Sequence, residues 1–380
     1  MTPFAKSVVT STATLLALLA VERAHPANGN PAIPKAIQRE VREWVYHGAN
    51  ADDELGLLAG YYDELLNASR DTIHAGNTAE LWDKALSRGS TQERLESFLL
   101  YRPKPSLGDP ADPTATIVTN RAGLFDRDYP EARTPGVRRL VWVGDSLSRG
   151  LGAPFGQALE PNVERWLNES QVGDGVAGFE ILNLAVEGYR TTQFVKVVEE
   201  ALPRFHPDVV VVGLSDLSVT RIWGRHLACL VHDGIDLEYP YLRELAARAA
   251  LKQDDAPTVT DAKLAPFSDE FVRWALATMQ ERCRAGGAEL AVVLLPAVGE
   301  VARLEARFEP ARAALRERGI VTLDLVSTFA DVPDLRPLRV SDIDHHPNPA
   351  GYQLLFERFR YELLKAPVAR ALITGRAGPG

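Results

Sequence analysis

Five short apolar runs in the later part of the chain constrain its fold more than any other feature. Each run is nearly continuous in Val, Leu and Ile, which is typical of strands that are buried on both faces. Stretches with helical periodicity, such as Thr191–Phe205 and Glu270–Ala285, lie between the runs. This alternation predicts an α/β fold, a three-layer αβα sandwich around a five-stranded parallel sheet. The runs are Arg139–Val143, Glu180–Leu184, Val209–Val212, Leu290–Leu295 and Val321–Leu325.

The segment before these runs has a different character. From Ile37 to about Leu100 the apolar residues recur at helical spacing, and four prolines then mark a boundary between Tyr101 and Pro113. We therefore expect a helical extension over residues 33–113, an α/β domain over 114–368 and a flexible tail over 369–380. A long insertion, Leu217 to about Phe267, either shapes or covers a site or is a surface excursion.

The N-terminus resembles a targeting segment. Lys6 precedes an apolar stretch, Val8 to Val21, that is short for a membrane span and fits the apolar region of a signal peptide. We expect residues 1–32 to form a signal peptide or N-terminal anchor with a linker, residues 7–21 being the candidate anchor. The protein would then be extracytoplasmic, that is periplasmic, secreted or membrane-anchored. A plain N-terminal helix is the alternative.

Composition excludes some classes of partner. The formal net charge is -9 and no long Lys/Arg run is present, so the chain is poorly suited to nucleic acid, whose phosphates need clustered positive charge. The two cysteines, Cys229 and Cys283, lie in no CxxC or Cys/His cluster, so they indicate no zinc site. They would pair in an exported protein or remain two separate buried thiols.

Polar residues follow the first three strands, at the edge where open parallel sheets bind ligands. Ser146 comes just after the first strand, next to Gly144, which allows a tight turn, and the start of the following helix favours a developing negative charge. Gly188 follows the second strand and could bring a backbone N–H to a substrate oxygen. Ser215 follows the third and could donate its hydroxyl. Helix caps at Ser146, Ser148 and Ser215 and a turn at Gly188 are the alternatives.

A second polar group follows the fifth strand. Asp344 stands two residues before His346, where it can hold the imidazole in one tautomer while the other ring nitrogen accepts a serine proton. Asp342 and His345 offer a second pairing, but Pro347 and Asn348 follow His346, and we favour that histidine. A metal site is disfavoured because adjacent histidine side chains diverge and no further Cys/His cluster is near.

These elements, in this order, resemble the four blocks of the SGNH (GDSL) hydrolase family, whose fold is flavodoxin-like. The resemblance covers roughly Thr119 to Leu364, and Thr119–Gly123 and Asp126–Tyr129 are similar to the lead-in of many bacterial members. The family's third block has an asparagine where this chain has Ser215. The matching residues are Gly144, Asp145, Ser146, Gly188, Asp344, His346, Pro347, Asn348 and Gly351.

The resemblance implies a serine hydrolase that cleaves carboxylic esters, of esterase, lipase or deacetylase type, through an acyl-enzyme. Ser146 would be the nucleophile, His346 the base and Asp344 its partner. The oxyanion hole would consist of the Ser146 and Gly188 N–H groups and Ser215. No cofactor or metal is implied, and the substrate would be a small-molecule, carbohydrate or lipid ester.

The same residues leave two alternatives open. One is an O-acyltransferase that acts on envelope carbohydrate, because a sugar hydroxyl can replace water in the second step. The other is a weakened, non-catalytic binding protein of the same fold. Ser215 is its main support, since loss of one oxyanion donor costs on the order of 100- to 1000-fold in rate.

Overall fold

The computed structural model describes residues 91–375 with the exception of 131, 171–174, 220, 256 and 343. The chain divides into two compact units, Met1–Leu57 and Leu58–Gly380, and every described residue belongs to the second. The expected signal peptide or anchor (1–32) and most of the expected helical extension (33–113) therefore lie outside the described residues.

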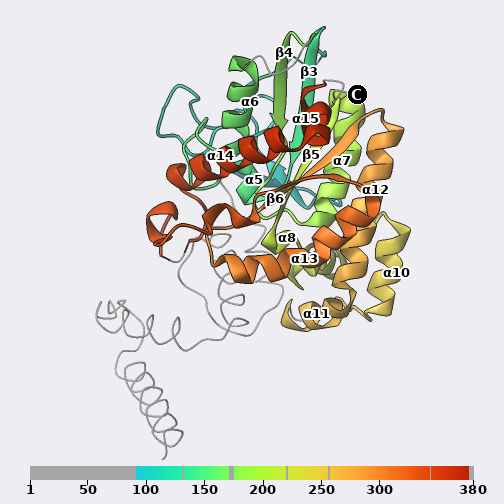
Figure 1. Cartoon of the computed structure of the whole chain (residues 1–380). Helices are drawn as coiled ribbons and strands as arrows, with labels where there is room; N and C mark the ends of the chain where they lie inside the picture. Colours follow the sequence, from blue (N-terminus) through green and yellow to red (C-terminus); the bar gives the residue numbers. More distant parts are fainter. Residues whose placement is uncertain are drawn as a thin grey trace, which may run out of the picture. The chain divides into compact units, whose positions relative to one another are not determined.

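The predicted five-stranded parallel sheet is confirmed (Figure 1). Its strand order is β4-β3-β5-β6-β7, and all neighbouring strands are parallel. The chain passes from β3 to β4 on one side of β3 and then crosses to β5 on its other side, which creates a crevice at the carboxyl end of β3. The strands are β3 (Val137–Val143), β4 (Gly178–Asn183), β5 (Val209–Ser215), β6 (Glu289–Leu295) and β7 (Val321–Asp324).

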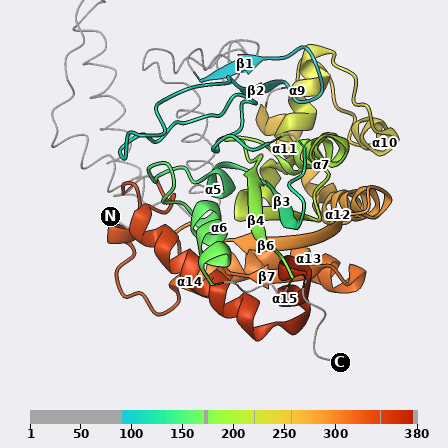
Figure 2. The ribbon, with the colours of Figure 1, turned by 90° about the horizontal axis from the view of Figure 1, so that it is seen from above.

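Both faces of the sheet are buried, because successive side chains of each strand point to opposite sides. Val141 and Val143 of β3 join one core with α7, α12 and α13, whereas Leu140 and Trp142 join a second core with α6, α14 and α15 (Figure 2). This explains why the runs are nearly continuous in apolar residues. The helices are α6 (Leu159–Glu169), α7 (Thr191–Phe205), α12 (Ser268–Ala285), α13 (Val301–Arg318), α14 (Pro349–Lys365) and α15 (Pro367–Thr374).

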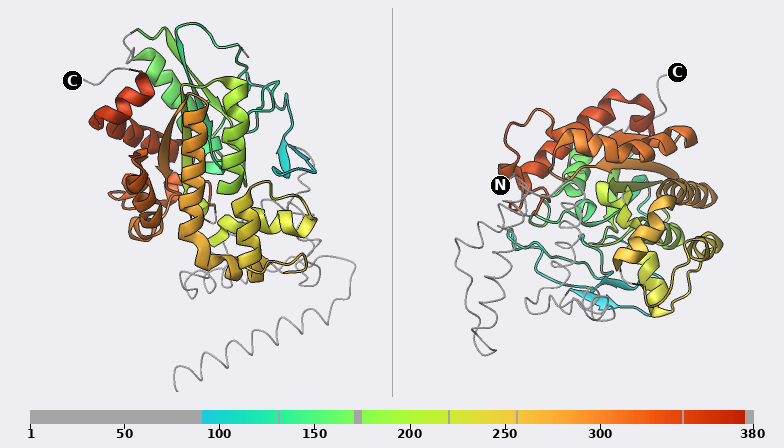
Figure 3. Two further views of the ribbon diagram at one scale, coloured as in Figure 1. Left: turned by 90° about the vertical axis from the view of Figure 1, so that its right-hand side faces the viewer. Right: turned by 90° about the horizontal axis from the view of Figure 1, so that it is seen from below.

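The insertion after β5 is helical and packs into the first core. Trp223 is fully buried and stacks on Phe271 of α12 with ring centroids 3.9 Å apart, and Leu227 and Leu242 are buried beside them. Figure 3 shows these helices, in yellow, gathered at one end of α7 and α12. They are α8 (Asp216–Val219), α9 (Arg225–Asp233), α10 (Pro240–Arg248) and α11 (Pro257–Leu264), with the 3₁₀ turns Arg221–Gly224 and Ala265–Phe267.

The helical prediction up to Leu100 is wrong at its end. β1 (Gln92–Arg94) and β2 (Tyr101–Pro103) pair as an antiparallel hairpin. Tertiary packing overrides the local periodicity, since Phe98 and Leu100 are buried in the first core. His226 of α9 anchors this loop: its Nε2–H donates to the Phe98 carbonyl at 2.6 Å, and burial lowers the pKa of His226 to about 3.

The C-terminal expectation also needs correction. Residues that were expected to begin a flexible tail form α15, because Ala369 and Ile373 are buried against the second core. Only residues 376–380 of that tail lie outside the description. Cys229 and Cys283 are both buried and form no disulfide bond with each other, so they are two separate thiols. Among the described helices, none combines the length and apolar character that a membrane crossing requires.

Candidate active site

Ser146 lies at the crevice that the strand order creates. It is the first residue of the short helix α5 (Ser146–Arg149), directly after β3, and only 5% of its surface is exposed. Asp145 caps this helix, because its Oδ1 accepts a hydrogen bond from Leu147 N at 3.1 Å. The Ser146 amide belongs to the first helical turn, where backbone N–H groups have no partner within the helix.

Ser146 meets His346 although 200 positions separate them in the sequence. Ser146 Oγ lies 2.8 Å from His346 Nε2, and His346 Nδ1 lies 2.6 Å from Asp344 Oδ1. The same carboxylate oxygen accepts the His346 backbone N–H at 3.0 Å. When Nδ1 carries the proton for Asp344, Nε2 is left as an acceptor for the serine hydroxyl. The three side chains thus form one hydrogen-bonded chain, and all three are buried.

The loop that carries His346 is held by the residues that follow it. The Asn348 side chain accepts from the N–H groups of Ala350 and Gly351 and so caps α14. Its amide group also donates to the carbonyls of Pro337 and Arg339, at 2.8 and 3.0 Å. Asn348 therefore ties the start of α14 to the preceding turn and fixes the approach of the loop to Ser146.

The alternative pairing of Asp342 with His345 does not form. Asp342 is exposed, and His345 Nε2 lies 3.3 Å from Nη1 of Arg339. The adjacent histidines therefore have different partners: His345 lies beside Arg339, and His346 lies beside Asp344. No group of three or more His, Cys, Asp or Glu side chains within the described ranges is placed to hold a metal ion.

Two backbone N–H groups, those of Ser146 and Gly188, are available at this site. No described residue accepts a hydrogen bond from the amide of Ser146 or of Gly188. Gly188 has a φ of +78°, in the left-handed region that favours glycine. The loop before it is joined to the Ser146 turn through a 3.1 Å bond from Val186 N to the Gly144 carbonyl.

Ser215 occupies a position that the sequence alone did not reveal. Its hydroxyl donates to Oδ2 of Asp145, and Ser218 donates to the same oxygen at 3.0 Å. Ser215 is fully buried. Because a hydroxyl has one proton, Ser215 can reach an oxyanion only after it releases Asp145. The sequence analysis named Asp145 only as a match to the family's first block, without this role, and it did not single out Ser218.

Glycine is required at position 144 because the Ser148 side chain approaches its backbone closely, and not because of a left-handed backbone conformation. A Cβ at Gly144 would lie 2.1 Å from Ser148 Oγ, and one at Gly213 would lie 2.0 Å from the same atom. Ser148 is thus inserted between the ends of β3 and β5. This contact requires glycine at both positions.

A buried ion pair joins α5, the helix that begins at Ser146, to the loop that carries Gly188. Arg149 Nη2 lies 3.1 Å from Oε1 of Glu187, and the guanidinium stacks over the Phe125 ring at 4.4 Å. Burial lowers the pKa of Arg149, and Glu187 opposes this effect. Arg149 and Glu187 were not singled out in the sequence, because neither falls within a motif.

Comparison with known proteins shows the family of the chain. The GDSL-like Lipase/Acylhydrolase family matches residues 142–354, more than half of the chain. The chain therefore belongs to this family, and it is a hydrolase of ester bonds.

Several solved structures are similar to part of the chain. TesA is 17% identical, with 60% of this chain and 98% of that chain covered and a TM-score of 0.38. A lipase/acylhydrolase from Enterococcus faecalis is 15% identical, covering 63% and 100%, with a TM-score of 0.38. A catalytic mutant of Axe2, an acetylxylan esterase from Geobacillus stearothermophilus, is 13% identical, covering 61% and 96%, with a TM-score of 0.40. No curated protein matches the chain significantly.

Proposed function

We propose that the chain hydrolyses carboxylic esters by two-step acyl transfer, with Ser146 as nucleophile, His346 as general base and Asp344 as its partner. The observation that carries the proposal is the continuous chain of short contacts, 2.8 Å from Ser146 Oγ to His346 Nε2 and 2.6 Å from His346 Nδ1 to Asp344 Oδ1. Both distances are within the reach that proton transfer needs.

In the first step Ser146 Oγ attacks the ester carbonyl while its proton passes to His346 Nε2. Asp344 stabilises the resulting imidazolium. The tetrahedral intermediate collapses, and the alcohol leaves with the proton from His346. In the second step His346 takes a proton from water, the hydroxide attacks the acyl-enzyme, and the acid is released as Ser146 regains its proton.

The negative charge of each intermediate falls on the former carbonyl oxygen. The Ser146 and Gly188 N–H groups are the donors left free for it among the described residues. Ser215 is the third candidate donor, but in the resting site its hydroxyl is bonded to Asp145. We assign Ser215 chiefly to holding Asp145, the cap of the nucleophile helix.

A panel of p-nitrophenyl esters of rising chain length tests the reaction. The wild-type protein should release nitrophenol, and Ser146→Ala should lose this activity. Ser148→Ala is the matched control, because Ser148 lies on the same helix with an Oγ that has no hydrogen-bond partner in the described structure. Activity that survives in Ser146→Ala but not in Ser148→Ala would overturn the assignment of the nucleophile.

Hydrolysis and acyl transfer to a sugar share the first step. Product analysis of the wild-type reaction, with and without an added carbohydrate acceptor, separates them. We expect the free acid as the main product in both cases. An acylated sugar as the main product would instead favour the O-acyltransferase.

Export of the protein is a separate proposal, supported only by the sequence pattern of residues 1–32. A fusion of these residues to a reporter enzyme that is active only outside the cytoplasm tests it. An inactive reporter would contradict an extracytoplasmic location.

A further inference from the structure

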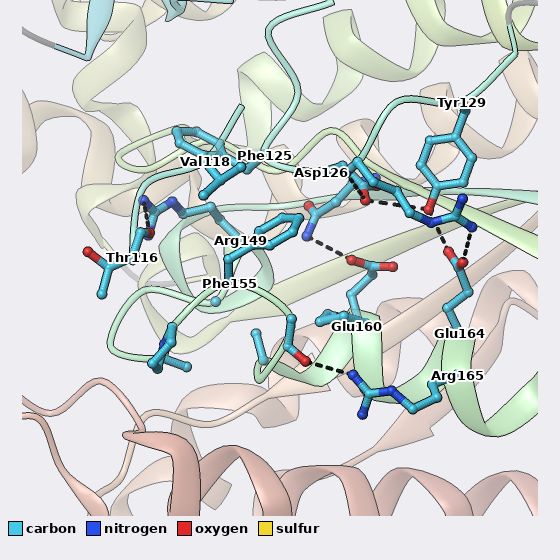
Figure 4. Close-up of a pocket in the computed structure, with 18 residues that line it drawn as sticks. Thr116, Val118, Phe125, Asp126, Tyr129, Arg149, Phe155, Glu160, Glu164 and Arg165 are labelled. Carbon is cyan, nitrogen blue, oxygen red and sulfur yellow. Dashed lines mark hydrogen bonds and ion pairs between the residues drawn. The ribbon is translucent and has the colours of Figure 1, made fainter. Parts of the chain in front are cut away.

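A cavity of about 330 Å³ lies beside the nucleophile helix. Its wall combines the segment before β3, the loop after α5, the first turns of α6 and Asn183 at the end of β4 (Figure 4). Arg149, the last residue of α5, also lines it. Since α5 rises about 1.5 Å per residue, Arg149 is about 4.5 Å along the helix from Ser146. Asn183 Nδ2 further joins this wall to α5 through the Ser148 carbonyl, at 3.3 Å.

Two of the three carboxyl groups in the cavity wall are well supplied with donors. Asp126 accepts from the N–H groups of Arg127 and Asn183, at 2.7 and 2.8 Å. Glu164 is paired with the Arg127 guanidinium and accepts from Tyr129 Oη at 2.6 Å and Ile181 N at 2.9 Å. These two side chains have their hydrogen bonds within the protein.

Glu160 is different. Only 3% of its surface is exposed, yet its one hydrogen bond in the described structure is a long contact of 3.3 Å from Asn183 Nδ2 to Oε2. Figure 4 shows Glu160 and Glu164 projecting from α6 toward Asp126 and Tyr129. Another buried group of the cavity wall lacks a bond entirely: Arg149 Nε has no hydrogen-bond partner among the described residues. Buried polar groups without partners are costly, and each indicates a ligand or water that completes its bonding.

The chemistry of the wall selects the class of ligand. Burial raises the pKa of Asp126 to about 8 and that of Glu160 well above its ordinary value, so burial favours the neutral form of both carboxyl groups. Glu164 is neutralised by Arg127, and Arg149 by Glu187. Arg165 is the third arginine of the wall, and it donates to Asn162 Oδ1 and to the Gly156 carbonyl rather than to a carboxylate. A wall with three arginines offers little to an ammonium group.

An acyl chain fits this wall no better. It would cover Glu160 and Arg149 Nε without supplying the hydrogen bonds that they lack, which is unfavourable for buried polar groups. A sugar ring suits both parts of the wall. Its hydroxyl groups donate and accept, while its C–H faces pack on apolar side chains, here Phe125 and Phe155.

We propose that this cavity binds a pyranose unit of the substrate, so that the ester cleaved at Ser146 belongs to an acylated carbohydrate. Glu160 would exchange hydrogen bonds with the sugar hydroxyls on one side of the ring, and Arg149 would donate on the other. This inference rests on the proposed ester hydrolysis and assigns the alcohol part of the substrate to a defined place.

Binding is measured in the Ser146→Ala protein, full length, by saturation-transfer NMR and calorimetry. The probes are methyl β-D-xylopyranoside and methyl α-D-glucopyranoside, with choline and hexanoate as the cationic and acyl alternatives. At least one glycoside should bind. Glu160→Met, which removes both oxygens at similar volume, should weaken binding at least about tenfold, the equivalent of one lost hydrogen bond. Glu169→Met, on the exposed face of the same helix, is the matched control and should bind like the parent.

A second variant tests the proposal independently, in case the Glu160→Met protein does not fold. Thr116 is exposed at the rim of the cavity, and Thr116→Trp should close the mouth without disturbing the core. It too should weaken glycoside binding about tenfold or more. Binding of choline or hexanoate alone, binding of no probe, or glycoside binding that both variants leave intact would overturn the proposal. A wild-type protein that does not hydrolyse nitrophenyl esters, or a Ser146→Ala protein that still does, would contradict the proposed function alone, because sugar binding is measured without turnover.

Discussion

The Ser215 hydroxyl donates to the Asp145 carboxylate, so the end of β5 holds the residue that caps the nucleophile helix. Ser218 adds a second bond to the same oxygen at 3.0 Å. The two hydroxyls fix Asp145, and Asp145 in turn orients the turn from which Ser146 projects. Ser215 thus acts on Ser146, the proposed nucleophile, through its neighbour Asp145.

This relationship predicts similar effects for Ser215→Ala and Ser218→Ala. Each removes one hydrogen bond to a charged group, so each should lower the free energy of unfolding by about 1.5–3 kcal/mol. Their kcat values for p-nitrophenyl acetate should agree within about tenfold, because an oxyanion donor would be worth on the order of 100- to 1000-fold. Urea unfolding and steady-state kinetics measure both quantities. A kcat of Ser215→Ala that is lower than that of Ser218→Ala by this larger factor would return Ser215 to the oxyanion hole.

The partner of His346 can be tested within its own loop. Asp344→Asn should lower kcat by about 10²- to 10⁴-fold, since the amide favours the wrong tautomer of the imidazole. Asp342→Asn is the matched control, because Asp342 is exposed in the same loop. Its kinetics should equal those of the wild type. Equal losses in the two variants would contradict the assignment.

The insertion of Ser148 between two glycines predicts a coupled pair of substitutions. Gly213→Ala places a methyl group 2.0 Å from Ser148 Oγ and should destabilise the fold by about 1–3 kcal/mol. Ser148→Ala removes the clashing oxygen, so the double variant should regain part of that loss. The free energies of unfolding of the four proteins form a double-mutant cycle. Strict additivity of the two effects would show that the contact is absent in solution.

The buried His226 should make the folded protein less stable in acid, and one substitution can separate this effect from those of other groups. Burial lowers the pKa of His226 to about 3 in the folded protein, whereas an unfolded histidine titrates near 6.5. Between these values the unfolded chain binds the extra proton, so stability falls as the pH is lowered, by up to about 1.4 kcal/mol per pH unit. His226→Gln keeps a donor for the Phe98 carbonyl but cannot be protonated.

The measurement for His226 is the free energy of unfolding from pH 7 to pH 4. The wild type should lose about 1 kcal/mol more per pH unit than His226→Gln below pH 6. The raised pKa values of Asp126 and Glu160 act in the opposite direction, because protonated carboxyls favour the fold and this contribution is lost as the pH rises. Both proteins retain these groups, so they cancel in the comparison. Parallel curves would contradict the role of His226.

The sequence by itself determined the strands, since continuous apolar runs such as Leu290–Leu295 have few alternatives to a sheet that is covered on both faces. It also marked Ser146, Asp344 and His346, because each stands at the end of a strand or loop where parallel sheets place their ligands. The strand ends were predicted within a few residues. Val209–Ser215, for example, extends three residues beyond the expected run.

Tertiary structure decided the features that depend on contacts between distant segments. The helical pattern extends to about Leu100, but burial of Phe98 and Leu100 against the first core selects a hairpin over residues 92–103. The bond from Ser215 to Asp145 spans 70 positions, so no local pattern could reveal it. In the sequence Glu160 cannot be told from an ordinary helix residue. Only the tertiary structure shows that it is buried with a single long hydrogen bond. Local preference acts over a few neighbouring residues, whereas burial and hydrogen-bond partners are settled only when the whole chain has packed.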